Sequence, residues 1–170
     1  MTQQDMPQRT GKLFAWLAWI IGLLFLYWLF DDMLQEQFNP NQNVQSTRNG
    51  EAIQVVLEQN RAGHYVATGA INNHRVLFLL DTGATQVAIP QNVAAAIGLP
   101  RGSQIMVNTA NGRATAYRTQ LDTLQLGDIV LRDVAATIVP GMGGEQILLG
   151  MSALKQVEFS QRGKMLTIGY

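Results

Sequence analysis

The stretch Val76-Leu77-Phe78-Leu79-Leu80-Asp81-Thr82-Gly83-Ala84 places one carboxylate directly after five apolar side chains. Burying an ionised carboxylate is costly unless it is paired or hydrogen-bonded, so a purely structural role at the end of a buried strand is unfavourable. Asp81 is better suited to a loop that water and a bound molecule can reach. There, Thr82 can supply a hydroxyl donor, and Gly83 lets the backbone turn tightly and bring an amide close to the carboxylate. The alternative is an ordinary turn in which Asp81 caps the backbone.

The sequence on either side of this stretch predicts an all-β domain over residues 51–170. Short apolar runs alternate with turn signals at a spacing of roughly 8–12 residues, which is typical of all-β domains. Asparagine and glycine tolerate positive φ and therefore favour tight hairpin turns. Such turns are expected at Asn72-Asn73-His74, Thr109-Ala110-Asn111-Gly112, Gly127-Asp128 and Arg162-Gly163. Short helices are expected over residues 92–97 and 151–155, the first because it is rich in alanine and stops at a glycine.

Residues 13–30 read LFAWLAWIIGLLFLYWLF and predict a transmembrane helix. The segment has 18 residues and no charge, and a helix of that length rises about 27 Å, close to the hydrocarbon thickness of a bilayer. A buried core helix is disfavoured because the segment is apolar on every side. A cleaved signal peptide would have a shorter apolar region and a small-x-small cleavage site, whereas Asp31-Asp32-Met33-Leu34 follows here. An uncleaved signal anchor is therefore favoured.

The charges that flank this segment predict its orientation. Arg9 and Lys12 precede it, while Asp31, Asp32 and Glu36 follow it. The positive-inside rule then places the N-terminus in the cytoplasm and the remainder outside. The expected organisation is a cytoplasmic N-terminus 1–12, a transmembrane helix 13–30, a polar linker 31–50 rich in asparagine and glutamine, and the β domain 51–170.

The composition excludes several classes of function. Twelve basic and 12 acidic residues cancel, and no block of like charge suggests binding to nucleic acid. The chain has no cysteine, which excludes disulfides, thiol catalysis and cysteine-ligated metal. His64 and His74 are the only histidines, and neither lies in a nucleophile motif, so a histidine-dependent triad is not expected. The sequence predicts neither a metal nor a cofactor.

Three ordered motifs resemble those of one protein family. Leu79-Leu80-Asp81-Thr82-Gly83-Ala84-Thr85 is similar to the active-site loop of retropepsin-like aspartic proteases. Thr109-Ala110-Asn111-Gly112 falls where that family places the flap hairpin that covers the substrate, and Ile147-Leu148-Leu149-Gly150 is similar to its second signature. The match covers residues 51–170 and looks closest to the bacterial membrane-anchored members. It implies a closed, mostly antiparallel acid-protease barrel with one or two short helices, located in the periplasm of a two-membrane bacterium.

The resemblance also implies roles for individual residues. Asp81 would be the catalytic carboxylate, supported by Thr82 and Gly83. The substrate, a polypeptide, would contact Ala84 and the flap residues Ala110, Asn111 and Gly112, while Leu149 and Gly150 would support the active site. Many members have Ser or Asp where this chain has Thr85, which changes a supporting hydrogen bond. The flap tip is polar here, so the family's substrate preferences do not transfer.

Aspartic proteolysis needs two carboxylates that share one proton, and this chain has one Asp-Thr-Gly. Asp122, Asp128 and Asp133 lack the Thr-Gly that follows Asp81. The second carboxylate is therefore expected from a second copy, in a homodimer with two-fold symmetry. A membrane anchor would confine two weakly associating copies to a plane and raise their effective concentration.

Two other interpretations stay open from the sequence. The first is a retropepsin-like module that binds peptides or assembles with partners without forming a catalytic pair. The second is a membrane-tethered β domain unrelated to proteases. The joint presence of Asp81, Thr82 and Gly83 favours a protease, since binding alone needs no buried carboxylate. Cleavage of a protein at mildly acidic pH would separate the protease from both of these interpretations.

Overall fold

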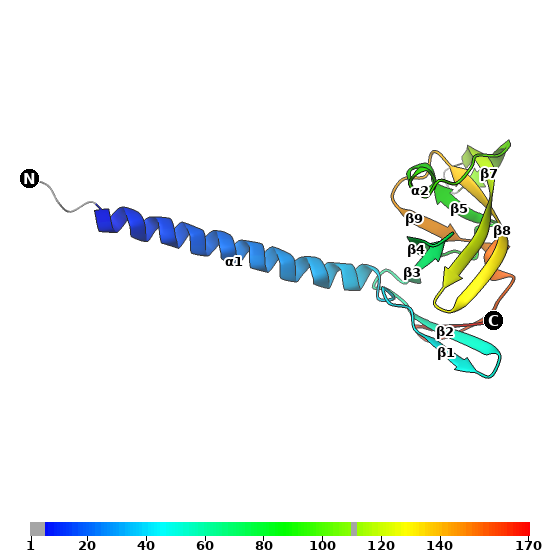
Figure 1. Ribbon diagram of the computed structural model, residues 1–170, viewed down its shortest axis with the longest axis horizontal. Helices are drawn as coiled ribbons and strands as arrows, with labels where there is room; N and C mark the ends of the chain where they lie inside the picture. Colours follow the sequence, from blue (N-terminus) through cyan, green and yellow to red (C-terminus); the bar gives the residue numbers. More distant parts are fainter. Residues whose placement is uncertain (1–5, 110–111) are drawn as a thin grey trace, which may run out of the picture. The chain divides into compact units, whose positions relative to one another are not determined.

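The computed structural model describes the backbone of residues 6–109 and 112–170, which divide into a helical unit that reaches Gln37 and a β unit, Phe38–Tyr170. The helical unit is α1, Met6–Phe38, a helix of 33 residues (Figure 1). Its segment Gly11–Phe38 is long and apolar enough to cross a membrane, and its most apolar window of 18 residues has a mean hydropathy of 2.2. A helix of this length and composition near the N-terminus suits either a membrane span or a signal sequence.

The helix extends past residue 30, where the sequence suggested that it would end. Residues 33–38 contain Met, Leu, Gln and Glu, which are good helix formers, and no glycine or proline interrupts them. Pro40 disfavours helical backbone at Asn39, which explains why the helix ends at Phe38. The first part of the expected linker is thus helical.

The second part of the expected linker belongs to the β unit. Asn39 and Asn41 are only 6% and 7% exposed. The Asn41 side-chain amide donates hydrogen bonds to the carbonyls of Glu58 and Val66, at 2.9 and 2.7 Å. Its Oδ1 accepts the Glu58 N–H at 2.7 Å, and its backbone carbonyl accepts the Thr68 N–H at 3.0 Å. Asn41 therefore joins two strands that are otherwise separated by a loop, and the domain begins near Phe38 and not at residue 51.

We expect the Asn41→Ala substitution to lower the free energy of unfolding by about 2–4 kcal/mol, because it leaves several buried backbone groups unpaired. Pulse proteolysis of the full chain in urea measures this quantity. The control is Asn43→Ala, at an exposed neighbouring position, which should change the free energy by less than about 0.5 kcal/mol. Equal effects of the two substitutions would contradict a structural role for Asn41.

The β unit contains eleven strands and two short helices, α2 and α3. The strands are β1 Ser46–Asn49, β2 Ala52–Glu58, β3 Val66–Ile71, β4 His74–Leu80, β5 Val87–Pro90, β6 Gln104–Thr109, β7 Gly112–Leu126, β8 Ile129–Val139, β9 Gln146–Leu149, β10 Glu158–Arg162 and β11 Met165–Gly169; the helices are α2 Gln91–Ala96 and α3 Met151–Leu154. The expected all-β class with short helices is confirmed.

The strands form two sheets. The 7-stranded sheet has the order β3-β4-β9-β5-β8-β7-β6, and an additional β3–β7 pairing closes it into a barrel. The 4-stranded sheet has the order β1-β2-β11-β10. Most neighbours are antiparallel, as expected, but β4–β9 and β5–β8 are parallel. The parallel β4–β9 pair matters for the site, because it makes the C-terminal ends of two strands adjacent.

Turn chemistry accounts for the hairpins that the sequence predicted. Asn72 and Asn73 both have positive φ, at 47° and 67°, as a two-residue turn between β3 and β4 requires. Gly127 and Gly163 occupy the same region in the β7–β8 and β10–β11 turns, each with φ of 59°. The β6–β7 hairpin is present as far as the pair Thr109–Gly112, and residues 110 and 111 lie outside the described part of the chain.

The core lies inside the barrel and beneath the 4-stranded sheet. Phe78 on β4 and Ile147 on β9 are fully buried in the barrel. Alternate residues of the 4-stranded sheet, such as Val55, Leu57 and Ile168, contribute to the same core cluster. This alternation of buried and exposed residues fixes the register of β4. The register in turn fixes the position of Asp81, the residue that follows the strand.

Candidate active site

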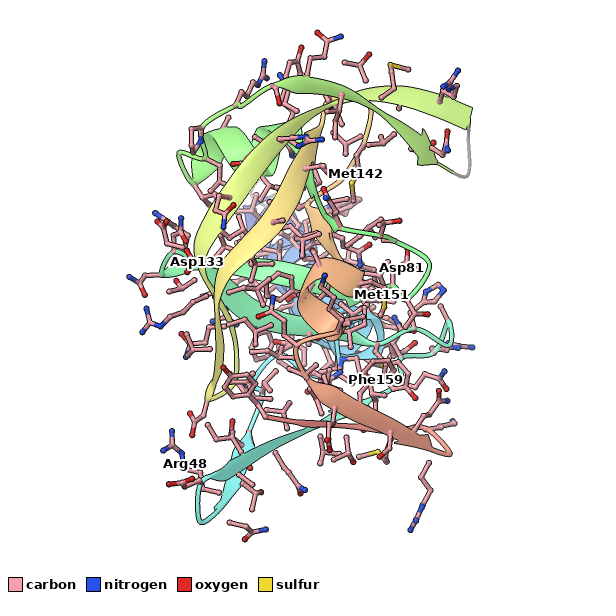
Figure 2. The ribbon with its side chains drawn as sticks, turned by 90° about the vertical axis from the view of Figure 1, so that its right-hand side faces the viewer. Arg48, Asp81, Asp133, Met142, Met151 and Phe159 are labelled. Carbon is pink, nitrogen blue, oxygen red and sulfur yellow. The ribbon has the colours of Figure 1, made fainter. Side chains whose placement is uncertain are left out.

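Asp81 is positioned by two parallel strands that end side by side. Leu80, the last residue of β4, is in register with Leu149, the last residue of β9. The Asp81 N–H donates a hydrogen bond to the Leu149 carbonyl at 3.2 Å. Asp81 therefore lies directly beside Gly150, which brings the two sequence motifs together. Figure 2 draws Asp81 close to Met151, the residue after Gly150.

The loop that follows is closed by its own backbone amides. The Gly83 N–H donates to Asp81 Oδ1 at 2.9 Å, and the Ala84 N–H donates to the Asp81 carbonyl at 3.2 Å. Asp81 is partly buried, while Thr82 and Gly83 are exposed. The carboxylate thus caps a tight turn, as the alternative interpretation supposed, and it is also open to solvent. The two readings of the motif are compatible in this geometry.

Gly150 is required by close packing against the same loop. The Met151 N–H donates to the Ala84 carbonyl at 2.8 Å. A Cβ atom added at Gly150 would lie 2.7 Å from the Ala84 carbonyl oxygen and would also overlap the Gln86 carbonyl oxygen. Its φ of −89° is accessible to any residue, so the need for glycine comes from contact and not from backbone conformation. The signature residue thus holds the Asp81 loop by direct backbone contact.

Ser152 is a site residue that the sequence analysis did not identify. It lies in α3 and is 8% exposed. Its Oγ accepts the Val87 N–H at 3.0 Å and donates to the Ala135 carbonyl at 2.7 Å. Ser152 therefore ties α3 to β5, the strand that directly follows the Asp81 loop, and to β8, the strand that directly precedes β9. The only feature of the sequence that could have indicated this role is the position of the serine, shortly after the buried run 146–149 and Gly150.

We expect Ser152→Ala to reduce the free energy of unfolding by about 1–3 kcal/mol, because the buried Val87 N–H and Ala135 carbonyl both lose a partner. Urea denaturation followed by pulse proteolysis tests this. Ser103→Ala, at an exposed site, is the matched control and should have little effect. A loss from Ser152→Ala no greater than that of the control would mean that water replaces the hydroxyl without cost.

The remaining predicted residues lie on the β6–β7 hairpin. Gly112 pairs with Thr109 and has φ of 104°, and the Thr109 hydroxyl donates to the Gly112 carbonyl at 2.8 Å. Ala110 and Asn111, the predicted flap tip, are outside the described residues. This hairpin joins β6 to β7, whereas the Asp81 loop joins β4 to β5, so the two belong to different strands of the barrel sheet.

The other aspartates that the sequence raised are remote from Asp81. Asp128 lies in the β7–β8 turn, where it forms an ion pair with Arg48 at 3.4 Å. Asp133 lies on β8 with φ of 53°, and Figure 2 draws it and Arg48 on the opposite side of the β unit from Asp81. Within the described residues, no group of three or more His, Asp or Glu side chains could hold a metal ion. The chain thus offers one exposed Asp-Thr-Gly loop with a single carboxylate.

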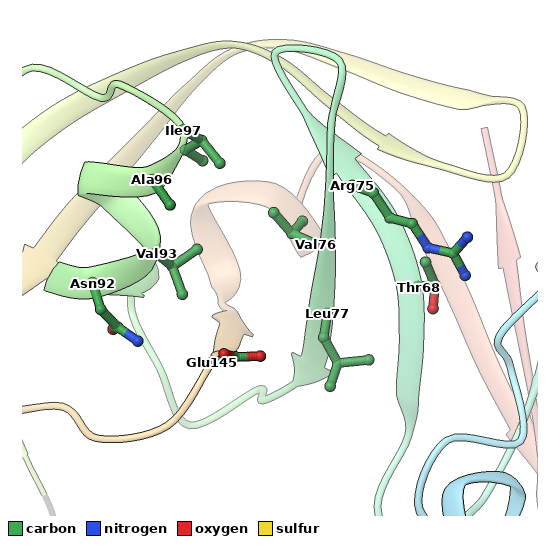
Figure 3. Close-up of a pocket in the computed structure, with 9 residues that line it drawn as sticks. All are labelled: Thr68, Arg75, Val76, Leu77, Asn92, Val93, Ala96, Ile97 and Glu145. Carbon is green, nitrogen blue, oxygen red and sulfur yellow. The ribbon is translucent and has the colours of Figure 1, made fainter. Parts of the chain in front are cut away.

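A hollow of about 310 Å³ lies elsewhere, between α2 and the outer face of β3 and β4 (Figure 3). Its lining mixes apolar and polar residues, and Arg75 and Glu145 provide its charged groups. Its lining includes Arg75, Val76 and Leu77 of β4 and does not include Asp81. The hollow is therefore distinct from the candidate active site.

Comparisons with known proteins agree with this geometry. Residues 67–156 match the family model described as gag-polyprotein putative aspartyl protease. An uncharacterized protein from the cobV 5′ region of a Sinorhizobium species is 35% identical over 111 residues, which is 64% of this chain and 48% of the relative. An uncharacterized protein of Rickettsia prowazekii is 28% identical over 127 residues, 72% of this chain and 52% of the relative. The chain thus spans about half the length of these curated relatives.

The fold also has a counterpart among solved structures. A retropepsin-like aspartic protease from Rickettsia conorii is similar, with a TM-score of 0.61 and 22% sequence identity. The match covers 73% of this chain and 96% of that structure. At this identity the likeness shows the fold. The barrel expected from the sequence is therefore confirmed as retropepsin-like.

Proposed function

We propose that this chain, which belongs to the family of gag-polyprotein putative aspartyl proteases, is a membrane-anchored aspartic endopeptidase whose active site forms from two copies. One observation carries the proposal. Asp81 stands at the ends of β4 and β9, its carboxylate is held by the Gly83 N–H at 2.9 Å, and the loop around it is exposed. This arrangement orients a carboxylate towards solvent without burying its charge.

The proposed chemistry uses one proton shared between two copies of Asp81. The ionised carboxylate accepts a proton from a water molecule as the water oxygen attacks the peptide carbonyl carbon. The protonated carboxylate donates its proton to the carbonyl oxygen, giving a neutral tetrahedral diol. Collapse of the diol breaks the C–N bond: the carboxyl that took the proton from water donates it to the leaving nitrogen, and the other carboxylate accepts a proton from a diol hydroxyl, which restores the starting pair.

The remaining site residues have supporting roles in this proposal. Thr82 is exposed, and we assign its hydroxyl to contact the loop of the second copy. Gly83 and Gly150 shape the loop, with Leu149 accepting the Asp81 N–H. A polypeptide substrate would lie along Ala84 and beneath the β6–β7 hairpin, where Ala110, Asn111 and Gly112 would cover it and exclude water.

The anchor in this proposal is α1, with residues 13–30 in contact with the lipid bilayer. The segment is apolar on all sides and its described side chains are exposed. Basic residues before it and acidic residues after it favour an orientation that puts the β unit outside the inner membrane, in the periplasm. Confinement to one membrane raises the effective concentration of the second copy.

A cleavage assay on the full chain tests the proposed function. The protein is purified in detergent micelles and incubated with a proteome-derived peptide library between about pH 4 and 7, which includes the mildly acidic conditions expected to suit an aspartic protease. Mass spectrometry identifies the cleaved bonds at several protein-to-detergent ratios. We expect cleavage whose rate rises more than linearly with protein concentration. Peptide binding without cleavage at any ratio would replace this proposal with a non-catalytic binding module.

A further inference from the structure

The hollow between α2 and β4 has an apolar wall with a carboxylate beside it. Val93, Ala96 and Ile97 of α2 form the wall together with Val76 of β4. Positions 93, 96 and 97 have the spacing of one helix face. Figure 3 draws the Glu145 carboxylate between Val93 and β4. The hollow therefore combines an apolar surface with a negative charge.

The polar groups on the α2 side of the hollow are hydrogen-bond acceptors. The Asn92 side-chain nitrogen donates to the Gly144 carbonyl at 3.1 Å, which leaves the Asn92 Oδ1 as the group that a ligand can reach. Glu145 is exposed and forms no ion pair with another described residue. Two acceptor oxygens, one of them charged, thus lie beside the apolar wall.

Arg75 does not neutralise this charge, although it lines the same hollow. Figure 3 draws its guanidinium directed away from α2, and its Nη2 donates to the Gln42 carbonyl at 3.4 Å. The charge that a ligand meets beside the wall is therefore negative. Such a site favours a group that donates hydrogen bonds, carries a positive charge and has an aliphatic stem. Among the side chains of proteins, lysine has all three properties.

The edge of β4 beside the hollow is open to a peptide backbone. The Asp81 N–H bonds to the Leu149 carbonyl, so every second residue of β4, counted back from Asp81, turns its backbone groups towards β9. β9 begins at Gln146, which lies opposite Leu77. Arg75 therefore has no β9 residue opposite it, and its N–H and carbonyl are strand-edge groups at the hollow. Extended peptides bind to such edges through their backbone.

We propose that the hollow is an exosite, a substrate-binding site away from the carboxylates, which takes a lysine side chain of the polypeptide. The ammonium group would bind Glu145 and the Asn92 Oδ1, and the methylene groups would pack against Val93 and Ile97. The inference rests on the proposed function, because it assigns the lysine to the substrate that is cleaved.

The position of the hollow on β4 predicts where in the substrate this lysine lies. Leu77 lines the hollow and stands four residues before Asp81. Strands rise about 3.3 Å per residue, so the two positions are about 13 Å apart. An extended substrate spans that separation with about four residues. The preferred lysine is therefore expected about four residues from the cleaved bond.

A second hollow beside α2 does not share this chemistry. It has a volume of about 440 Å³ and lies between α2 and residues 140–144. Its lining includes no charged side chain. Charge therefore favours the hollow that contains Glu145 as the lysine site.

Binding to full-length Asp81→Asn protein in detergent micelles tests the exosite without cleavage. The probes are Nα-acetyl-lysine methylamide and its norleucine analogue, which keeps the aliphatic stem and lacks the charge. We expect the lysine probe to shift the NMR signals of the Val93 and Ile97 methyl groups and to bind about tenfold more tightly than the norleucine probe. Glu145→Gln should abolish this difference, whereas Glu51→Gln, at another exposed position, should preserve it. Equal binding of the two probes, or no shift of either methyl signal, would overturn the proposal.

Charge exchange tests the same contact during cleavage. In a peptide that the protein cleaves, with lysine at the fourth residue from the cleaved bond, replacement of that lysine by norleucine should raise KM about tenfold. The value of kcat should stay unchanged, because the contact is equally strong in the bound substrate and in the transition state. Glu145→Lys should instead favour peptides with glutamate at that position by about tenfold. Glutamate peptides that this variant cleaves no better than wild type does would exclude the contact.

The exosite and the proposed function fail separately. Cleavage that depends on Asp81, without lysine-selective binding or a response to charge exchange, would leave the protease proposal standing and remove the exosite. Lysine-selective binding that requires Glu145, in a protein that cleaves no peptide, would establish the lysine site and remove the protease proposal.

Discussion

Asp81→Asn is expected to abolish peptide cleavage, with a loss of at least about a thousandfold in the rate of the full chain. Asparagine cannot accept or return a proton, so neither copy in a dimer of the variant can activate water. The substitution should preserve the fold, because its side-chain oxygen can still accept the Gly83 N–H that Asp81 Oδ1 accepts at 2.9 Å. Turnover of a cleaved library peptide, measured by mass spectrometry, gives the rate.

The control for this prediction is Asp122→Asn, an exposed aspartate on β7. It removes the same charge from the chain and should retain wild-type turnover. Resistance to a second protease should be equal for wild type and both variants, which would show that all three are folded. Cleavage that persists in Asp81→Asn would assign the activity to another group or to a contaminant.

Gly150→Ala is expected to have the second largest effect, lowering the free energy of unfolding by about 3 kcal/mol and removing activity. The added Cβ would overlap carbonyl oxygens of Ala84 and Gln86, which belong to the backbone and cannot move aside as a flexible side chain could. Relief of this overlap must shift either α3 or the Asp81 loop. Both the stability of the β unit and the position of Asp81 therefore depend on the absence of a side chain at position 150.

Gly141→Ala is the matched control for the effect of a methyl group. A Cβ atom at Gly141 meets nothing within 4 Å, and the residue has no positive φ. Its unfolding free energy should differ from wild type by less than about 0.5 kcal/mol. If Gly150→Ala and Gly141→Ala unfolded alike, the close contact would not constrain the loop as described.

Much of the fold was predictable because local rules decide it. Asn72 and Asn73 adopt the positive φ values that a two-residue hairpin needs, and the sequence placed a turn there. Alternation of buried and exposed residues fixes the strands on either side. The apolar run before Asp81 correctly indicated a strand that ends at the carboxylate. Gly150, which the sequence singled out by its resemblance to a family signature, contacts the backbone of that loop, and its support of an active site stays a prediction.

The features that the sequence did not reveal depend on contacts between distant segments. Asn39 and Asn41 look like part of a polar spacer, since asparagine is common in linkers. Their burial depends on backbone groups of Glu58, Val66 and Thr68, which no local pattern connects to them. Ser152 likewise contacts Val87 and Ala135 far along the chain. The parallel pairing of β4 with β9 belongs to the same class, because local periodicity does not specify a strand's neighbour.

The most direct test of the central claim is a mixing experiment with wild-type and Asp81→Asn chains, because the claim is that each active site uses two copies of Asp81. The two proteins are exchanged in shared detergent micelles at equal concentration, at a fixed total amount that saturates dimer formation. If both carboxylates are required, only pairs of two wild-type chains cleave, and activity should fall to about one quarter of that of the undiluted wild type. Activity that falls only to one half would mean that each chain acts alone, and would contradict the account.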